Sequence, residues 1–257
     1  MMIPVISTIA VNTFRETIRD RILLIILLFA LGFSVISGIV SQWSLNQEAK
    51  ILQDFGFTTI TAFGLIIAIF SGVGLVYKEI DKRTIYNVLS KPISRAEFII
   101  GKYCGLLLTL FVNFLLMGAG FVILYWLFTG VVHLKLIPAI GMIFLQMSVM
   151  VAIVLFYSAF TSPLVSTVLS LFTFLAGNIS ADIYSIGSGV KNTLFVHLLQ
   201  AMYYIFPNFS LLNIQTQVVH DLKISIMSIM IGILYTVVYS ALLLMIINII
   251  FKRRDLK

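Results

Sequence analysis

The sequence predicts an all-α integral membrane protein with six transmembrane helices, and three observations lead to this fold class. Hydrophobic residues make up 60% of the 257 residues and charged residues only 11%, whereas soluble domains are about 45–50% apolar and about 25% charged. Mean hydropathy is +1.10. The apolar residues fall in separate runs of the length that spans a bilayer. Because no polar stretch is long enough for an extramembrane domain, residues 1–257 are expected to form a single transmembrane domain.

The first element is an amphipathic helix over residues 1–21. Ile6, Ala10, Phe14 and Ile18 share one face of this helix, and charged side chains lie on the opposite face. A helix with this pattern typically lies in the plane of the membrane interface. We therefore expect an interfacial helix on the cytoplasmic surface; the alternative is a simple cytoplasmic extension of the first span.

Six apolar runs are long enough to cross the hydrocarbon core, which needs roughly 20 helical residues. They are residues 22–40, 58–76, 104–128, 137–159, 163–183 and 228–251. A further run, residues 193–206, is shorter and ends at Pro207, which fits a re-entrant or interfacial helix. It belongs to an external segment, residues 184–227, whose aromatic side chains, Phe209 among them, are expected at the membrane interface.

The basic residues predict the orientation. With six spans and a cytoplasmic N-terminus, 13 of the 17 Lys and Arg residues lie on the cytoplasmic side. The four on the external side are Lys50, Lys135, Lys191 and Lys223. This is a strong positive-inside bias, and a seventh span would remove it by placing the basic C-terminal tail outside. We therefore expect a multi-pass protein of the inner (cytoplasmic) membrane with both termini in the cytoplasm.

The only sizeable cytoplasmic loop, residues 77–103, connects the second and third spans. Ile80, Thr84 and Val88 share one side of a predicted short helix, with charged residues around the rest. Pro92 ends this helix, because the residue before a proline avoids the helical region. The loop is therefore expected to be structured rather than a flexible tether.

A second helix is predicted to follow within the same loop. Ser94 and Glu97 have the spacing of a capping box, in which each residue bonds the backbone N–H of the other. The helix that they begin should continue directly into the third span. By contrast, the fourth and fifth spans are joined only by a tight turn over residues 160–163.

Residues that could support catalysis or cofactor binding are sparse. The nearest approach to a phosphate-binding loop, Gly101-Lys102, lacks the first glycine and the final Ser or Thr of that motif. The histidines, His133, His197 and His220, are far apart in sequence and lack metal-ligand spacing. We therefore predict no catalytic residue, no metal and no cofactor in this chain, and any ATP would be bound by a partner chain.

Several polar residues within the spans have two possible roles. Asn113, Gln146, Asn178 and Asn248 could line a substrate pathway, but such residues more often hydrogen-bond between helices. Asp182, at the outer end of the fifth span, could be solvated by the headgroups or could belong to a pathway. Both roles remain open at this point.

Small residues in the spans favour close helix packing. Gly101 and Gly105 have the small-xxx-small spacing that lets two helices approach closely. Cys104 lies between them and is the only cysteine, so a disulfide within one chain is excluded. We predict a packing role for the two glycines rather than a chemical one.

The cytoplasmic loop carries the most specific local pattern. Its sequence is Glu79-Ile-Asp-Lys-Arg83-Thr-Ile-Tyr-Asn-Val-Leu89-Ser-Lys-Pro-Ile-Ser-Arg95, followed by Phe98-Ile-Ile-Gly-Lys. This stretch is similar to the "E…GT…L…P(I/V)(S/R)R…(L/I)…GK" loop of the permease subunits of ABC exporters of the ABC-2 type. Arg83 stands where a glycine is common in that family. Residues 204–213 also look like the external segment of the branch that contains the nitrous-oxide-reductase maturation permease, and the resemblance covers essentially the whole chain.

The resemblance implies a membrane-spanning permease subunit of an ATP-binding cassette exporter that moves an unknown substrate across the cytoplasmic membrane. In that family the loop forms a coupling helix that docks into a P-loop ABC ATPase subunit. The residues that would carry this contact here are Glu79, Ile80, Arg83, Val88, Leu89, Lys91, Pro92 and Arg95. Two permease halves make the working unit, so the partners implied are the ATPase, a second copy or a paralogous permease, and membrane lipid.

Other classes of function are less well supported. The net charge of +7 is too sparsely distributed for a nucleic-acid groove, so no nucleic-acid partner is expected. An intramembrane enzyme would need clustered catalytic groups at membrane depth, and a non-transporting scaffold would not need a structured basic loop. Both remain alternatives to the permease.

Overall fold

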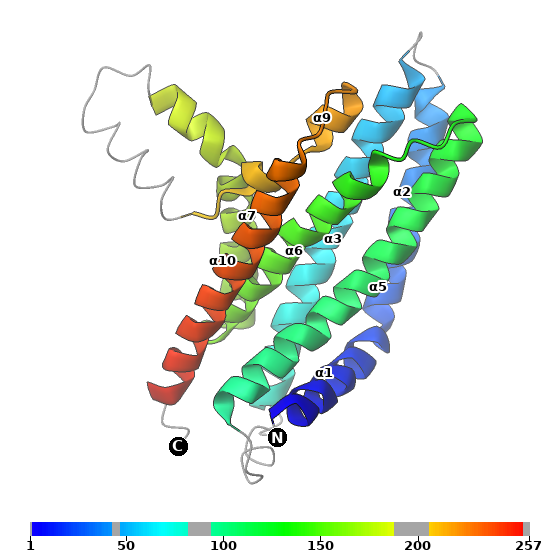
Figure 1. The fold of residues 1–257 in the computed structure, drawn as a ribbon. Coiled ribbons are helices and arrows are strands. Elements are labelled where there is room, and N and C mark those ends of the chain that lie inside the picture. The colour runs from blue at the N-terminus through cyan, green and yellow to red at the C-terminus, as the bar shows by residue number, and fades with distance from the viewer. Residues whose placement is uncertain (1, 43–46, 82–93, 188–205, 254–257) are drawn as a thin grey trace.

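The computed structural model describes residues 2–42, 47–81, 94–187 and 206–253. It confirms the predicted all-α membrane fold, because six of its helices are long and apolar enough to cross a bilayer. These helices are α2 (Arg21–Ser41), α3 (Glu48–Asp81), α5 (Arg95–Thr129), α6 (Leu136–Ser158), α7 (Pro163–Gly187) and α10 (Ile226–Arg253). The N-terminal helix and the end of α10 lie at the same end of the bundle (Figure 1), which we call the terminal end.

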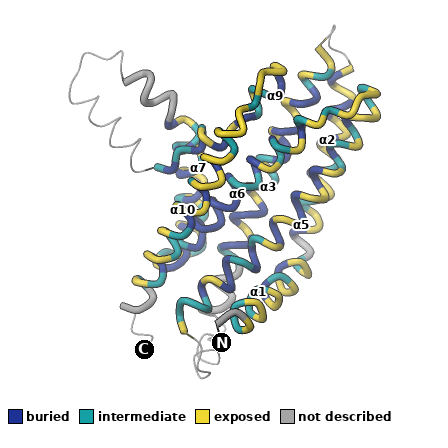
Figure 2. The backbone as a smooth tube through the Cα atoms, in the orientation of Figure 1, coloured by how far each residue is buried: buried dark blue, intermediate teal, exposed yellow. Residues whose placement is uncertain are grey.

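Helix α6 forms the centre of the bundle. It contacts α3, α5, α7 and α10, and 72% of its apolar window is buried inside the protein, compared with 17% for α10. Side chains such as Ile143 and Met147 are completely buried. Figure 2 shows this concentration of buried residues along α6 and on the sides of the helices that face it. Four of the other five spans therefore pack directly on α6, and α2 packs against α3 and α5.

Helices α3 and α5 are longer than the spans predicted within them. Helix α3 begins at Glu48 rather than near residue 58, and its first turns pack against the last turns of α5. The ring of Phe121 lies on Gly56 and makes an edge contact with Phe57, with 5.7 Å between the ring centroids. These contacts bury apolar side chains of residues 48–57. Polar residues are mixed with the apolar ones in this segment, so the sequence did not mark it as part of a span.

The start of α5 has the predicted capping box. The Ser94 hydroxyl accepts a bond from the Glu97 backbone N–H at 3.2 Å, and the Ser94 N–H donates to Glu97 Oε2 at 2.9 Å. The helix then runs without interruption to Thr129, as predicted. Gly130 ends it in the left-handed conformation, with φ of 72°, which glycine adopts at no steric cost.

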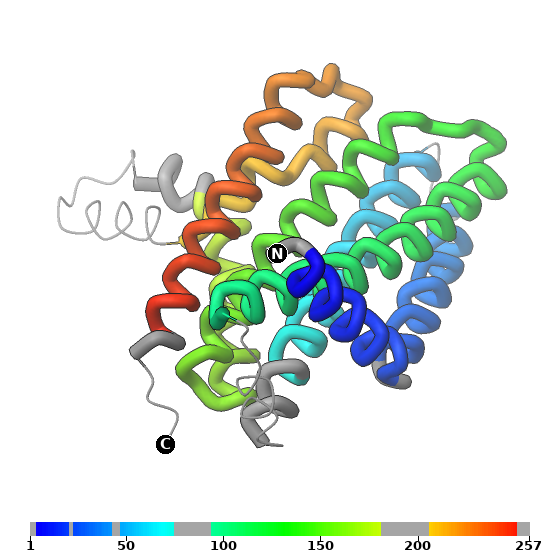
Figure 3. Tube along the Cα trace, turned by 60° about the horizontal axis from the view of Figure 1, so that its bottom comes forward, coloured from blue at the N-terminus to red at the C-terminus, as the bar shows by residue number. Residues whose placement is uncertain are grey.

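Helix α1 (Met2–Ile18) crosses the first half of α5 at the terminal end (Figures 1 and 3). The glycines of α5 allow a close approach. A Cβ atom at Gly105 would lie 2.6 Å from the Ala10 carbonyl oxygen, and one at Gly101 would lie 2.8 Å from the side chain of Ile9. The predicted packing role of these two glycines is confirmed, and their partner is α1.

The part of α1 that packs against Gly105 of α5 includes Ala10, from the predicted apolar face, and Thr13. Thr13 and Thr17 are buried against the bundle, whereas Ile18, expected on the apolar face, is 43% exposed. The small side chain of Thr13 suits the close approach at Gly105, where an added Cβ would lie 2.6 Å from Thr13 Cβ. The helix itself is present as predicted, and its position at the membrane interface stays a prediction.

The turn between α6 and α7 is as short as predicted, and the Ser158 and Ser166 hydroxyls bond across it at 2.8 Å. The short helix η1 (Phe209–Leu212) packs against α6, α7 and α10, and the short helix α9 (Gln215–Val219) packs against α3 and α6. Phe209 is fully buried against Gly177. The protein therefore covers this ring, because the chain packs onto α7 here, and its position at the membrane interface stays a prediction.

Candidate functional site

Most of the predicted partner-binding loop falls between two described helices. Five of its eight candidate residues lie outside the described residues: Arg83, Val88, Leu89, Lys91 and Pro92. Glu79 and Ile80 belong to the last turn of α3, and Arg95 is the first residue of α5. The last turn of α3 and the first turn of α5 lie at the terminal end of the bundle (Figure 1).

The start of α5 is held firmly in place. The capping box fixes its first turn, and α1 packs along the next turns through Gly101 and Gly105. Between these contacts, Lys102 is only 8% exposed, and its ammonium group lies 5.5 Å from the centroid of the Phe98 ring, within the range of a cation–π interaction. The first turns of α5 are therefore anchored both by their own cap and by α1.

Two of the polar residues in the spans meet. Gln146 Nε2 on α6 donates to Asn178 Oδ1 on α7 at 3.0 Å, and Asn178 Nδ2 donates to the Phe174 carbonyl oxygen at 2.9 Å. Gln146 is 1% exposed. This geometry is that of an interhelical hydrogen bond, the packing role that sequence reasoning weighed against a pathway role.

The other polar candidates are separated from this pair. Asn113 is buried and bonds within its own helix, from Nδ2 to the Thr109 carbonyl oxygen at 2.8 Å. Asp182 lies in the last turns of α7, and its side chain is outside the described residues. Asn248 lines a groove between α5 and α10. The candidates therefore do not form one continuous polar path in the part of the chain that the structure describes.

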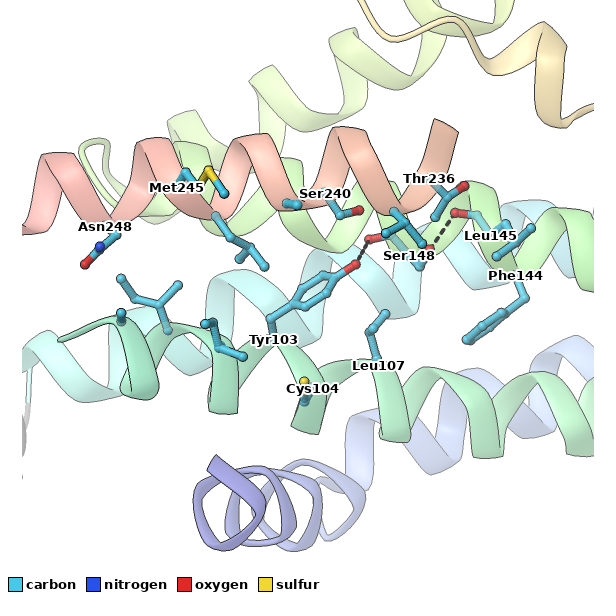
Figure 4. Close-up of a pocket in the computed structure, with 16 residues that line it drawn as sticks. Tyr103, Cys104, Leu107, Phe144, Leu145, Ser148, Thr236, Ser240, Met245 and Asn248 are labelled. Carbon is cyan, nitrogen blue, oxygen red and sulfur yellow. Dashed lines mark hydrogen bonds between the residues drawn. The ribbon is translucent and has the colours of Figure 1, made fainter. Parts of the chain in front are cut away.

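The groove beside Asn248 has a volume of about 540 Å³ and is bounded by α5, α6 and α10 (Figure 4). Tyr103 points from α5 across the groove, and its hydroxyl donates to the Ser148 carbonyl oxygen on α6 at 3.3 Å. Thr236 and Ser240 line the groove from α10. Sequence reasoning singled out only Asn248 here, although Thr236 and Ser240 are four residues apart and so share one helix face.

A charged cluster closes the opposite end of the bundle. Lys135, just before α6, pairs with the carboxylate of Asp221, just before α10, and His133 Nε2 lies 3.9 Å from the same carboxylate. Asp221 has a positive φ of 53°, a conformation that Asp and Asn tolerate better than most residues. The hydrogen bond from Lys135, its charge and that of His133 lower the pKa of the Asp221 carboxyl from its ordinary value.

Asp221→Asn is expected to lower the thermal midpoint at neutral pH while keeping the backbone conformation. Because the folded-state pKa of Asp221 is lowered, its stabilising contribution is present above its unfolded-state pKa and is lost as pH falls through the folded value. The difference in midpoint between wild type and variant should therefore shrink toward zero in acid. Thermal unfolding of the purified protein from pH 7 downward measures it. Asp54→Asn is the control, because Asp54 makes no ion pair among the described residues, and an equal pH-dependent difference there would contradict the assignment.

Comparison of the sequence with models of known protein families gives a match. The model of a family described as ABC-2 family transporter protein matches residues 7–256, nearly the whole chain. No curated protein matches the sequence. The matched region contains all six span helices, most of α1 and the segment between α3 and α5.

Proposed function

Because the chain belongs to the ABC-2 family of transporter proteins, we propose that it is the permease subunit of an ATP-binding cassette exporter and moves an unidentified substrate across the cytoplasmic membrane. The observation that carries the proposal is the family match over residues 7–256 on a bundle of six span helices. Both termini lie in the cytoplasm in this proposal, which the excess of Lys and Arg in the sequence segments assigned to the cytoplasmic side supports.

ATP is bound and hydrolysed by a separate P-loop ATPase, and this chain holds no cofactor of its own. The ATPase docks on the segment between Glu79 and Arg95. The anchored ends of this segment support the assignment, because α3 reaches deep into the core and α5 is fixed by its capping box and by α1. A partner that moves this segment therefore moves two long helices.

The working unit contains two permease halves, either two copies of this chain or one copy and a paralogue. Helices α2 and α7 support this, because only 28% and 33% of their apolar windows are buried within one chain. Their exposed faces carry large apolar side chains such as Phe29 and Phe172. These faces are available to a second half as well as to lipid.

The test is to purify the chain alone and after co-expression with candidate P-loop ATPases from the same organism. We expect no ATP hydrolysis above background from the chain alone, and hydrolysis in a stable complex with one ATPase. A complex in which the phosphate-loop lysine of the ATPase is replaced by alanine is the control, since that lysine contacts the transferred phosphates. Hydrolysis that persists in this control, or the failure of every P-loop ATPase to co-purify, would contradict the proposal.

A further inference from the structure

The exposed side of helix α3 differs from that of the other spans. In the described membrane-spanning parts of α2, α5, α6, α7 and α10, each exposed residue is a glycine or has an apolar or aromatic side chain. On α3, by contrast, Lys50, Asp54 and Thr58 are exposed. These residues are four positions apart, so they lie on one face of the helix. We call these three residues the polar stripe.

The depth of the polar stripe follows from the packing of α3 on α5. A Cβ atom at Gly56 would touch the ring of Phe121, and one at Gly64 would touch the ring of Phe114. The two helices are therefore antiparallel, and these contacts fix their register. The register places an exposed residue of α5 level with each residue of the stripe: Leu127 with Lys50, Ile123 with Asp54 and Ala119 with Thr58.

The exposed side of α5 is apolar at this depth, as expected of a surface that faces lipid. Leu127 and Ile123 are 64% and 55% exposed, and Trp126 is of the residue type enriched at the membrane interface. From Lys50 to Thr58 the helix rises about 12 Å at about 1.5 Å per residue, a large part of one leaflet of the roughly 30 Å hydrocarbon core. The polar stripe therefore continues well inside the level at which α5 meets hydrocarbon.

Helix α9 adds a polar group at the inner end of the stripe. It packs on α3 (Figure 1), and Gln215 Nε2 donates to Thr61 Oγ1 at 3.3 Å. Both residues are half-buried, and Thr61 lies three positions beyond Thr58, beside it on the helix. Farther along α3 the large exposed side chains are those of Ile66 and Phe70. The polar surface therefore ends between Thr61 and Ile66.

Water is the surrounding that fits this surface. An aspartate in hydrocarbon is costly, and its short side chain cannot extend to the headgroups as a lysine side chain does. A dry contact with another helix would also remove the hydration of the Asp54 carboxylate, and charged residues are depleted from the cores of protein interfaces. Lipid and a tightly packed partner are therefore both poor matches for the stripe.

We propose that the outer half of α3 and helix α9 line a water-filled vestibule of the transport path, at the end of the bundle opposite the terminal end. The polar stripe faces the water, and the pair of Gln215 and Thr61 lies near the inner end of the vestibule. In the orientation proposed above, the vestibule opens to the outside of the cell and the substrate leaves through it. The route of the substrate rests on the proposed function, whereas the presence of water along α3 does not.

Single cysteines at matched depths test the vestibule. Cys104→Ala first removes the only native thiol. Asp54→Cys and Thr58→Cys are then compared with Ile123→Cys and Ala119→Cys, which are exposed positions at the same depth on α5. The full chain is placed in phosphatidylcholine nanodiscs, where both membrane faces are accessible, and is treated with a charged, membrane-impermeant methanethiosulfonate. Because the reactive thiolate forms in water and is disfavoured in apolar surroundings, the cysteines on α3 should react at least tenfold faster than those on α5.

Two outcomes of this comparison would overturn the proposal. Equally slow reaction at all four positions would show that lipid or a second permease half covers the stripe. Equally fast reaction would show that hydrocarbon does not reach this depth on either helix. Neither outcome bears on whether an ATPase co-purifies with the chain, so failure of the vestibule and failure of the proposed function are distinguishable.

The wild-type protein gives a second readout. Phe55 lies three positions from Thr58, beside it on α3, and is 46% exposed, while Phe33 on α2 is 49% exposed. The contacts of α5 with both helices, such as that of Gly120 with Leu31 of α2, place the two phenylalanines at about the same depth. Hydroxyl-radical footprinting in the same nanodiscs, read by mass spectrometry, should oxidise Phe55 at least threefold faster than Phe33. Equal oxidation of the two rings would overturn the proposal even if the cysteine variants failed to fold.

Discussion

Replacing Gly105 with leucine is expected to separate α1 from α5 and to lower the free energy of unfolding by about 3 kcal/mol, the upper part of the range for overpacked sites. The physical reason is the absence of space. A Cβ atom at this position would lie 2.6 Å from both the Ala10 carbonyl oxygen and Thr13 Cβ. The backbone oxygen cannot move without displacing α1, so the side chain cannot be accommodated by a small rotation.

Comparing Gly105→Ala with Gly141→Ala tests whether steric overlap with α1 causes the loss of stability at Gly105. Alanine in place of glycine ordinarily stabilises a helix interior by about 1 kcal/mol. At Gly141, where a Cβ atom would meet nothing within 4 Å, Gly141→Ala should therefore raise the thermal midpoint in detergent. Gly105→Ala should lower it. If both substitutions raise the midpoint, α1 does not pack against α5 as closely as the structure indicates.

Val88→Asp and Leu89→Asp are expected to abolish co-purification of the ATPase and transport, while insertion and abundance of the permease stay near normal. Both residues lie outside the described part of the chain, so this expectation rests on the sequence pattern and on the proposed function. Helix-in-groove recognition depends on apolar anchors on one helix face. A carboxylate at an anchor position should weaken binding about 100-fold, or about 2.8 kcal/mol.

The control for these loop variants is Asn87→Asp, which adds the same charge beside the anchors without removing an apolar side chain. If basic residues of the loop only contact anionic headgroups, all three variants should behave alike, because orientation depends on charge alone. If the loop docks in the ATPase, Asn87→Asp should retain the complex and the other two should lose it. Retention of the ATPase by all three would refute the docking role.

The sequence predicted the spans well because each is a long apolar run, and length is the property that a bilayer selects. It also predicted the start of α5, because a capping box is a local pattern in which the side chains of Ser94 and Glu97 each accept a hydrogen bond from the other residue's backbone N–H. It underestimated α3, since residues 48–57 mix polar and apolar side chains and their burial depends on contacts with α5, such as that between Gly56 and Phe121.

The parts that sequence reasoning missed depend on how helices meet. Gly101 and Gly105 indicated close packing but not which helix supplies the partner, and the small residues Ala10 and Thr13 on α1 were the available signal. The groove depends on three helices that are distant in sequence. Its only local trace is the four-residue spacing of Thr236 and Ser240, which becomes informative once α10 is known to face Tyr103.

The central position of α6 has a consequence for biogenesis. As the chain is synthesised, α6 enters the membrane before α7 and α10, the helices that later cover much of its surface. Until α7 follows, the amide of Gln146 lacks the Asn178 acceptor that it bonds in the finished bundle. A nascent chain that stalls after α6 would therefore expose a polar side chain to lipid, and rapid insertion of α7 removes that exposure. The short turn between α6 and α7 shortens this interval, because only a few residues separate one insertion event from the next.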